Sequence, residues 1–213
     1  MKKLLGIFAT LFLLIFTTPS LSIDSDLAKM VMEIGGGDID KGLGHLQKLS
    51  KEGNSTATFI LADLLFQEKQ IKSAHRLFVK SAELDHPIAM KFLATGYFKG
   101  AFGEKDYEKA RYWYERSAKF KNINSMVYLG FIYRDGLGVS KDLKTAYLWF
   151  TIASILKPNV SGHKEPEDFA NELAPYLTES QISNTKRSAK TWISQHAKNK
   201  KKPPGIPPIK SER

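Results

Sequence analysis

The middle of the chain repeats itself at an interval of 36 residues. Leu93 and Tyr97 return as Leu129 and Tyr133, and a glycine follows each tyrosine at the same distance. The second half of the unit returns in the same register, in the aligned pairs Asp106 and Asp142, Ala110 and Ala146, Trp113 and Trp149, and Tyr114 and Phe150. Because a period of this length is typical of stacked supersecondary units, it restricts the chain to a repeat architecture.

The spacing inside one unit indicates two α-helices joined by a glycine-containing turn. Ala110, Trp113, Tyr114, Ser117 and Ala118 recur at three- and four-residue intervals, which places them on one helical stripe. A single hairpin of this length cannot bury such a stripe, whereas stacked hairpins can. We therefore predict an all-α fold, a right-handed superhelical array of helix-turn-helix repeats (an alpha-alpha superhelix, or solenoid). The aromatic stripe is interpreted as core and not as a cofactor site.

Two weaker copies precede these units. Ala74, Phe78 and Ala82 stand 36 residues before Ala110, Tyr114 and Ala118, and this copy has a turn four residues shorter. Leu61 and Leu65 are expected on the core face of its first helix. Further upstream, Gly42, Leu46 and Ser50 repeat the same second-helix pattern at an interval of 32 residues. We expect a degenerate helical hairpin over residues 23–52, with its first helix over residues 27–34, followed by three repeats over residues 53–157.

The C-terminal part of the chain predicts a cap for the array. Helices are expected within residues 163–197, one over residues 167–176 and a longer one that begins at Thr178. Thr178 with Gln181 forms a capping-box pattern, and Leu177 with Ile182 forms the matching hydrophobic staple. The long helix has an apolar face of Ile182, Ala189, Trp192 and Ile193 and an opposite face of Lys186, Arg187, Lys190 and Gln195. Residues 198–213 are Lys- and Pro-rich and are expected to be a disordered basic tail.

The N-terminus has the pattern of a secretory signal peptide over residues 1–22. Lys2 and Lys3 precede the apolar run 4–16, and Ser20 and Ser22 supply small residues for cleavage. The run is shorter than the roughly 20 apolar residues of a membrane span, so no transmembrane segment is expected after processing. The chain has no cysteine, which excludes disulfides and lipid attachment at a mature N-terminal cysteine. The short basic start is typical of bacteria, and we expect a periplasmic or secreted protein.

The repeat pattern resembles the Sel-one-like repeat family, whose units are tetratricopeptide-like. The copy around Leu129 matches best, and the copy around Leu93 departs where Ala101-Phe102-Gly103 shifts the second glycine by one position. The matching residues of the best copy are Leu129-Gly130, Tyr133, Gly136-Leu137-Gly138-Val139, Asp142, Ala146 and Trp149-Phe150. The resemblance implies a protein-binding scaffold or adaptor, as in exported bacterial members of the cell envelope. Some exported bacterial relatives are rich in cysteine and are linked to penicillin binding. The resemblance does not imply that activity here, because this chain has no cysteine.

No pattern in the sequence indicates catalysis. The chain lacks a nucleophile elbow, a phosphate-binding loop and a dinucleotide-binding glycine fingerprint. Its five histidines, His45, His75, His86, His163 and His196, show no spacing that would hold zinc on a helix face. The glycines 35–37 are interpreted as a helix-ending turn. We therefore expect no enzyme activity, no cofactor and no metal, and an exported chain is not expected to bind nucleic acid.

A partner-binding face follows from the resemblance, because the first helix of each tetratricopeptide-like hairpin lines the concave surface. If Leu61 and Leu65 face the core, the neighbouring stripe forms a groove for a protein or peptide partner. The candidate partner-binding residues are Phe59, Asp63, Phe66, Lys91, Phe98, Phe131 and Arg134, with Thr95 and Val127 at equivalent positions. Packing of the phenylalanines against neighbouring helices is an equally weighted alternative.

The basic tail offers a second function. The whole chain has a formal net charge of +10, and the tail from Lys198 onward holds six basic residues against Glu212. Lys200, Lys201 and Lys202 could bind an anionic lipid or envelope polymer, with the repeats as a spacer. A solubilising terminus is the alternative interpretation.

Overall fold

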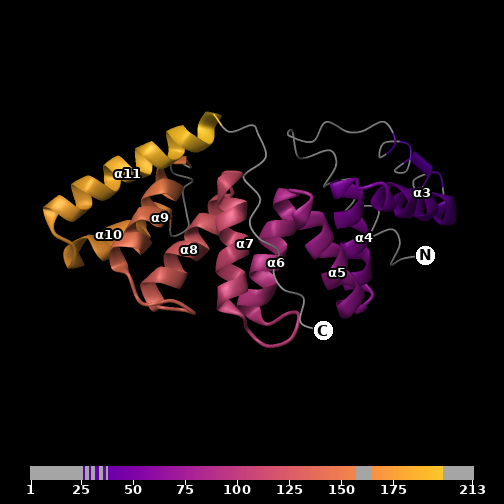
Figure 1. The fold of residues 1–213 in the computed structure, drawn as a ribbon, viewed down its shortest axis with the longest axis horizontal. Helices are drawn as coiled ribbons and strands as arrows, with labels where there is room; N and C mark the ends of the chain where they lie inside the picture. Colours follow the sequence, from indigo (N-terminus) through magenta and orange to yellow (C-terminus); the bar gives the residue numbers. More distant parts are fainter. Residues whose placement is uncertain are drawn as a thin grey trace. The chain divides into compact units, whose positions relative to one another are not determined.

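The protein is helical throughout the part of the chain that the structure describes. This computed structural model describes residues 38–156 and 165–198, together with residues 26, 29, 32, 33 and 36, and it places helices and turns there but no strand (Figure 1). The helices are α3 (Ile39–Lys51), α4 (Ser55–Gln67), α5 (Ile71–Glu83), α6 (Pro87–Lys99), α7 (Tyr107–Lys119), α8 (Ile123–Asp135), α9 (Leu143–Leu156), α10 (Pro166–Leu173), the 3-10 helix η1 (Ala174–Tyr176) and α11 (Glu179–Lys198). The all-α tandem-repeat fold class is confirmed.

The helices divide into two compact units, residues 1–117 and residues 118–213. The boundary falls near the end of α7. The first unit contains α3, the hairpin α4–α5, and α6 with most of α7. The second unit contains the hairpin α8–α9, followed by α10, η1 and α11. The predicted copies therefore correspond to the hairpins α4–α5, α6–α7 and α8–α9.

The repeated alanines and aromatics form the core of the hairpins. Phe78, Tyr114 and Phe150 occupy equivalent positions of the three second helices, and each is fully buried. The second-helix alanines at equivalent positions, Ala74, Ala82, Ala110, Ala118 and Ala146, are also fully buried. In the degenerate copy, Leu46 and Ser50 of α3 are buried as the pattern predicts. The predicted first helix of that copy, residues 27–34, lies largely outside the described residues.

Helix α4 differs from the prediction for its face. Leu61 and Leu65, expected in the core, are half-buried, whereas Phe59 is only 5% exposed. The reason is that α4 has neighbours on several sides. Its Thr58 hydroxyl lies 3.0 Å from that of Ser50 in α3, and its Phe59 ring lies 4.8 Å from the His86 ring at the start of α6. Apolar residues are therefore needed around most of the helix, which removes the one-sided pattern that the prediction used.

The helix starts repeat as regularly as the core. Asn54, His86 and Asn122 precede the three first helices at the repeat intervals. Their side chains accept a hydrogen bond from the backbone N–H of the third residue of the helix, at 2.9, 3.2 and 3.0 Å respectively. Each side chain thereby satisfies a helix-terminal donor that would otherwise lack a partner.

The recurrent aspartate has the same role at two of the second helices. Asp106 and Asp142 accept from the backbone N–H groups of Lys109 and Thr145 at 2.9 and 3.0 Å. Their own backbone N–H groups donate to the carbonyls of Tyr97 and Tyr133, the repeated tyrosines, at 3.0 and 2.8 Å. The aspartate therefore starts the second helix and also closes the turn from the first.

The turns between paired helices require glycine at defined points. Gly100 and Gly136 end α6 and α8 in the left-handed conformation, with φ of 77° and 68°. Gly138 also has a positive φ of 65°, as predicted for the tight turn of the best copy. These dihedral angles are strained for residues that carry a Cβ atom.

The second unit closes with the predicted helices. The side chain of Gln181 accepts from the Thr178 N–H at 2.8 Å, and the Thr178 hydroxyl accepts from the Gln181 N–H at 3.2 Å. The capping box is therefore confirmed. Leu177 and Ile182, the predicted staple, both pack against a buried cluster formed by α9 and α10, whose members are Ala146, Tyr147, Phe150, Ala170 and Leu173.

His86 makes the stability of the first unit depend on pH. Burial lowers the pKa of His86 to about 4, and its Nδ1 must stay unprotonated to cap α6. The unfolded chain binds a proton near the ordinary pKa of about 6.5, so the free energy of unfolding falls as pH drops from there toward 4. The loss amounts to at most about 3 kcal/mol.

We predict that His86→Asn, which copies the caps Asn54 and Asn122, keeps the helix start and flattens this pH dependence. Chemical unfolding followed at several values between about pH 7 and pH 4.5 measures the effect. Some slope remains, because burial also lowers the pKa of His75. An unchanged slope in the variant would contradict the assignment to His86.

Two helical glycines predict opposite effects of the same substitution. A Cβ atom on Gly130 would lie 2.3 Å from the ring of Phe150, whereas a Cβ atom on Gly44 would meet nothing within 4 Å. Phe150 is fully buried and cannot move aside. Gly130→Ala is therefore expected to destabilise the protein by about 1–3 kcal/mol through overpacking.

Gly44 lies in the middle of α3 on its solvent-exposed side. Gly44→Ala is therefore expected to stabilise the protein by about 0.5–1 kcal/mol, because alanine favours a helix more than glycine does. Thermal unfolding of the two variants against the parent protein measures both effects. Equal shifts of the same sign would show that the close approach of Phe150 to α8 does not constrain residue 130.

Candidate functional site

The candidate partner-binding residues lie on the first helices, and the structure places them in different surroundings. Phe59 belongs to the core of the first unit, where its ring stacks on His86 at 4.8 Å and lies 5.7 Å from Phe78. With 5% of its surface exposed, it offers almost no area to a partner. For Phe59, core packing is therefore the correct alternative, and its placement in the groove was wrong.

Phe66 is half-buried within an aromatic cluster of the first unit. Its ring lies 5.3 Å from Phe92 in α6 and 6.2 Å from Phe102 in the turn after α6. Phe102 itself covers Gly96, where a Cβ atom would lie 2.1 Å from its ring. Phe102 belongs to the segment Ala101-Phe102-Gly103, in which this copy departs from the repeat pattern. Its ring packs on α6, so the departure has a structural role. Phe66 keeps part of its surface exposed beside this cluster.

Asp63 and Lys91 are half-buried charged residues on successive first helices. The amide of Gln67 donates to the Asp63 carboxylate at 2.7 Å. Burial raises the pKa of Asp63, and the hydrogen bond from Gln67 opposes that rise. Among the residues that the structure describes, neither Asp63 nor Lys91 forms an ion pair. The Asp63 carboxylate is therefore partly removed from water, and among the described residues no opposite charge lies at contact distance from it.

Phe98, near the end of α6, packs against aromatic residues of α7. Its ring lies 5.4 Å from Tyr107 and 6.4 Å from Tyr114 in α7. Thr95, one turn before it, accepts a hydrogen bond from the Tyr114 hydroxyl at 3.2 Å. Phe98 is half-buried by these contacts, so it supports the hairpin and presents only part of its ring to solvent.

In the second unit, Phe131 and Arg134 form one ordered group on α8. The Phe131 ring packs on Phe150 at 5.4 Å and on Phe169 of α10 at 4.9 Å. The Arg134 guanidinium lies 4.8 Å from the centre of the Phe131 ring. It also donates two hydrogen bonds to the Asp135 carboxylate, at 2.7 and 2.8 Å, which lowers the pKa of Asp135.

Sequence reasoning missed Gln67 and Asp135, which hold the candidate charges in place. Gln67 stands four residues after Asp63, a spacing at which helix side chains meet, so the pattern contained that signal. Asp135 directly follows Arg134, and neighbours in sequence do not ordinarily share a helix face. That pair could not be anticipated from spacing.

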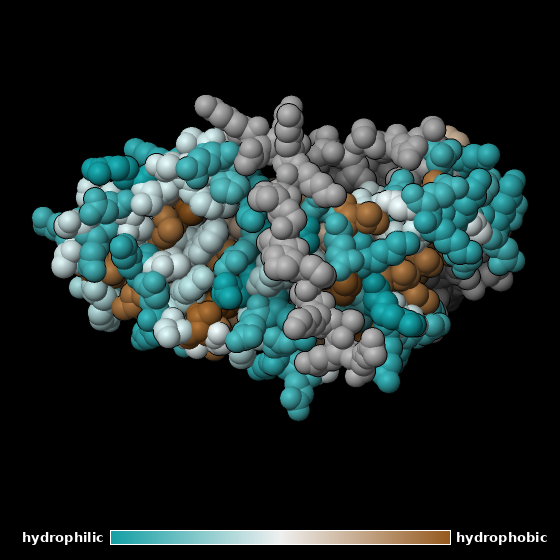
Figure 2. Space-filling view, in the orientation of Figure 1, coloured by the Kyte–Doolittle hydropathy of each residue, from teal (hydrophilic) through white to brown (hydrophobic). Residues whose placement is uncertain are grey.

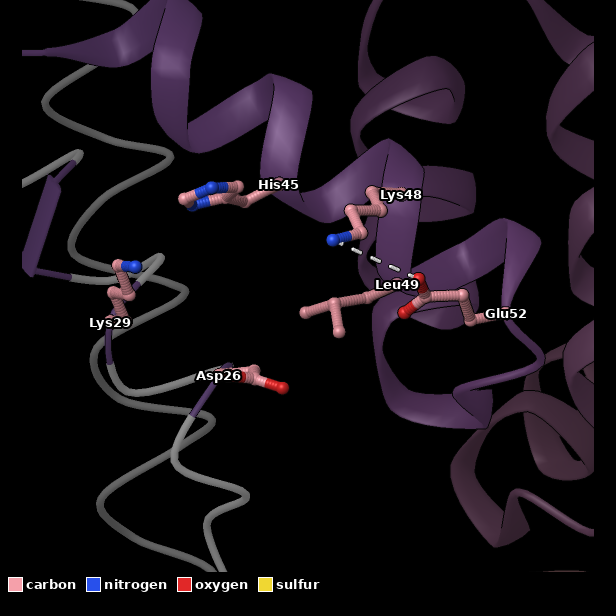
Figure 3. A pocket seen from close by; sticks show the side chains of 6 residues that line it. All are labelled: Asp26, Lys29, His45, Lys48, Leu49 and Glu52. Carbon is pink, nitrogen blue, oxygen red and sulfur yellow. Dashed lines mark ion pairs between the residues drawn. The ribbon is translucent and has the colours of Figure 1, made fainter.

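A pocket of about 120 Å³ lies on α3 in the first unit. Figure 3 shows its lining side chains, Asp26, Lys29, His45, Lys48, Leu49 and Glu52. Its charges are largely paired: Lys48 lies 4.0 Å from Glu52, and His45 lies 2.6 Å from Glu33. None of the candidate partner-binding residues lines this pocket.

Other features bear on the kind of site. In the described part of the chain, no cluster of three or more His, Asp or Glu residues could hold a metal ion. No described helix combines the length and the apolar character that crossing a bilayer requires.

The residues predicted to bind an anionic surface, Lys200, Lys201 and Lys202, lie outside the described residues. Figure 2 shows apolar side chains over the first unit as separate patches among hydrophilic ones.

Comparisons with known proteins agree with the hairpin assignment. A sequence model of the Sel1 repeat matches residues 61–86, 87–119 and 123–157. The first match begins inside α4, and the others span α6–α7 and α8–α9. A search of curated proteins finds no match.

Two solved structures share the fold. One is the crystal structure of c5321, a protective antigen present in uropathogenic Escherichia coli strains that displays an SLR fold; it is 20% identical, with a TM-score of 0.61 over 97% of this chain and 43% of that one. This chain therefore spans less than half of that protein's length. The other is a Sel1 repeat protein from Oxalobacter formigenes, 25% identical, with a TM-score of 0.53 over 61% of this chain and 97% of that one.

Proposed function

We propose that this chain, which matches the Sel1 repeat over residues 61–86, 87–119 and 123–157, is a protein-binding scaffold of the bacterial cell envelope. Proteins of this family are generally protein-interaction scaffolds. In this proposal the partner, a protein or a peptide, contacts the first helices α4 and α6 of the first unit, and α8 carries the equivalent surface of the second unit. The cell-envelope address rests on the predicted signal peptide at residues 1–22.

The observation that carries the proposal is the partly buried Asp63 carboxylate on α4, with Lys91 half-buried on the next first helix, α6. A half-buried charge loses part of its hydration, and an opposite charge or a hydrogen bond normally compensates for that loss. Gln67 compensates Asp63 in part, and Lys91 has no ion-pair partner among the described residues. A bound partner that supplies a cationic group to Asp63 and an anionic group to Lys91 would complete the compensation.

The aromatic surroundings fit the same interpretation. Phe66 and Phe98 keep part of their rings exposed on the same two helices. In the second unit, Arg134 is held in one orientation by Phe131 and Asp135, so little side-chain entropy is lost when a partner binds it. Aromatic residues and arginine dominate the energetics of protein interfaces. The first helices thus carry residues of the types expected at a binding face.

The test substitutes the charged residues Asp63 and Lys91 and leaves the phenylalanines unchanged. Alanine at Phe98 or Phe131 would remove contacts to Tyr107 or Phe169 and would destabilise the hairpins as well as any interface. Asp63→Asn keeps an acceptor for Gln67, and Lys91→Gln keeps most of the aliphatic stem. We predict that this double variant binds a partner captured by the parent protein about 10- to 100-fold more weakly.

The partner is first captured from a cell-envelope extract at low and at high salt, identified by mass spectrometry, and then titrated against each variant. Lys72→Gln with Glu83→Gln is the matched control, because both side chains are exposed on the second helix α5 and the net charge is again unchanged. Circular dichroism verifies that both variants are folded. Equal affinity of the parent and the Asp63/Lys91 variant would overturn the proposal, as would equal losses in both double variants.

A further inference from the structure

Helix α11 carries its exposed cations on one flank. With about 100° of rotation per residue, Lys186, Lys190, Arg187 and Lys198 fall within an arc of about 120°. The first three of these side chains are exposed. The adjacent exposed arc holds only the uncharged residues Asn184, Ser188, Thr191 and Gln195. The charge is therefore one-sided and does not follow from exposure alone.

Packing in the second unit fixes which flank faces outward. Thr185 and Ala189 are buried on the opposite side of α11, and the Trp192 ring lies 5.6 Å from Trp149 of α9. The stack of His196 on Trp192, at 4.0 Å, continues this contact toward the C-terminus. Because α11 cannot rotate without breaking these contacts, the cationic flank stays in solvent.

No acidic residue opposes this flank along most of the helix. Between Ser180 and Lys198 the sequence contains no Asp or Glu, and Glu179 stands in the first turn, where it favours the helix dipole. Within the described part of the chain, Lys186, Arg187 and Lys190 form no ion pair. The sequence then continues with Lys200, Lys201 and Lys202.

The form of the flank indicates the chemistry of its ligand. From Lys186 to Lys198 the helix rises about 18 Å, which is longer than one small anion. Three of the four cations are lysines, which act as point charges and do not impose the planar two-point geometry of arginine. No aromatic side chain lies on the cationic arc, whereas single-stranded nucleic acid is held by bases stacked on aromatics beside basic residues. These properties fit a flat array of anionic groups.

We propose that the cationic flank of α11 docks on the surface of an anionic phospholipid bilayer. The contact is electrostatic and peripheral, since the apolar face of α11 is already packed on α9. This inference is independent of the partner-binding face of the first helices. It places a membrane-surface contact on the terminal helix α11.

The test measures co-sedimentation of the mature chain, residues 23–213, with two kinds of vesicle. One contains phosphatidylglycerol and phosphatidylcholine in a one-to-two ratio, and the other contains phosphatidylcholine alone. Binding is expected only to the anionic vesicles, and it should be lost as salt rises from about 0.05 to 0.5 M. The variant Lys186→Gln, Arg187→Gln, Lys190→Gln should bind about 100-fold more weakly, because each cation near an anionic surface contributes about fivefold.

The matched control is Lys51→Gln, Lys72→Gln, Lys105→Gln, which removes the same charge from exposed positions of the first unit. It should bind as the parent does, and a variant that ends at Lys198 should keep a part of the binding that the α11 substitutions abolish. Equal losses in the two triple variants would reduce the effect to net charge and overturn the proposal. Absence of vesicle binding by the parent, or a preference for a soluble polyanion over vesicles, would overturn it as well.

Discussion

Each hairpin buries one aromatic ring of its second helix, and in α8–α9 that ring packs against a small residue of the first helix. Phe78, Tyr114 and Phe150 are fully buried at equivalent positions. The matching first-helix position is Ala62, Ala94 or Gly130, and all three are buried. At Gly130 the approach is so close that a Cβ atom would lie 2.3 Å from the ring of Phe150. This approach sets the distance between paired helices, and the caps and turns must then fit that distance.

The capping residues follow from this requirement. A short connection between two closely packed helices leaves terminal backbone groups without partners unless nearby side chains supply them. Asp106 and Asp142 bond to the next helix through the side chain and to the repeated tyrosine carbonyl through the backbone. The same geometry explains why glycine ends α6 and α8 with positive φ. The repeated polar residues are thus as structural as the repeated aromatic ones.

Several equivalent positions of the first helices differ in chemistry between copies. Asp63, Thr95 and Phe131 are equivalent, and so are Phe59, Lys91 and Val127, yet their chemistry changes from copy to copy. The second-helix positions of Ala74 and Phe78 keep the same class of residue in all three copies and are fully buried. A stack with an invariant core and variable first-helix positions can adapt its surface to a particular partner while its fold is preserved. This separation is the physical basis for a scaffold function.

The sequence was sufficient for the hairpins because the core positions recur in register. The cap at Thr178 was equally predictable, since a capping box depends on local spacing, whereas the capping role of the repeated Asp142 appeared only in the structure. The buried face of α4 could not be predicted in this way, because a helix with neighbours on several sides loses its apolar periodicity. For this reason Phe59 was assigned to the groove and not to the core. Site residues were harder still: whether Lys91 is paired, or Phe131 covered by Phe169, depends on contacts between helices distant in sequence.

Hydrogen exchange of the mature chain, measured with and without its captured protein partner, tests the central claim most directly. If the first helices carry the binding face, exchange should slow in α4, α6 and α8, while α5 and α9 stay unchanged. Slower exchange confined to α5 and α9, or to α11 alone, would contradict the account and move the binding face away from the first helices.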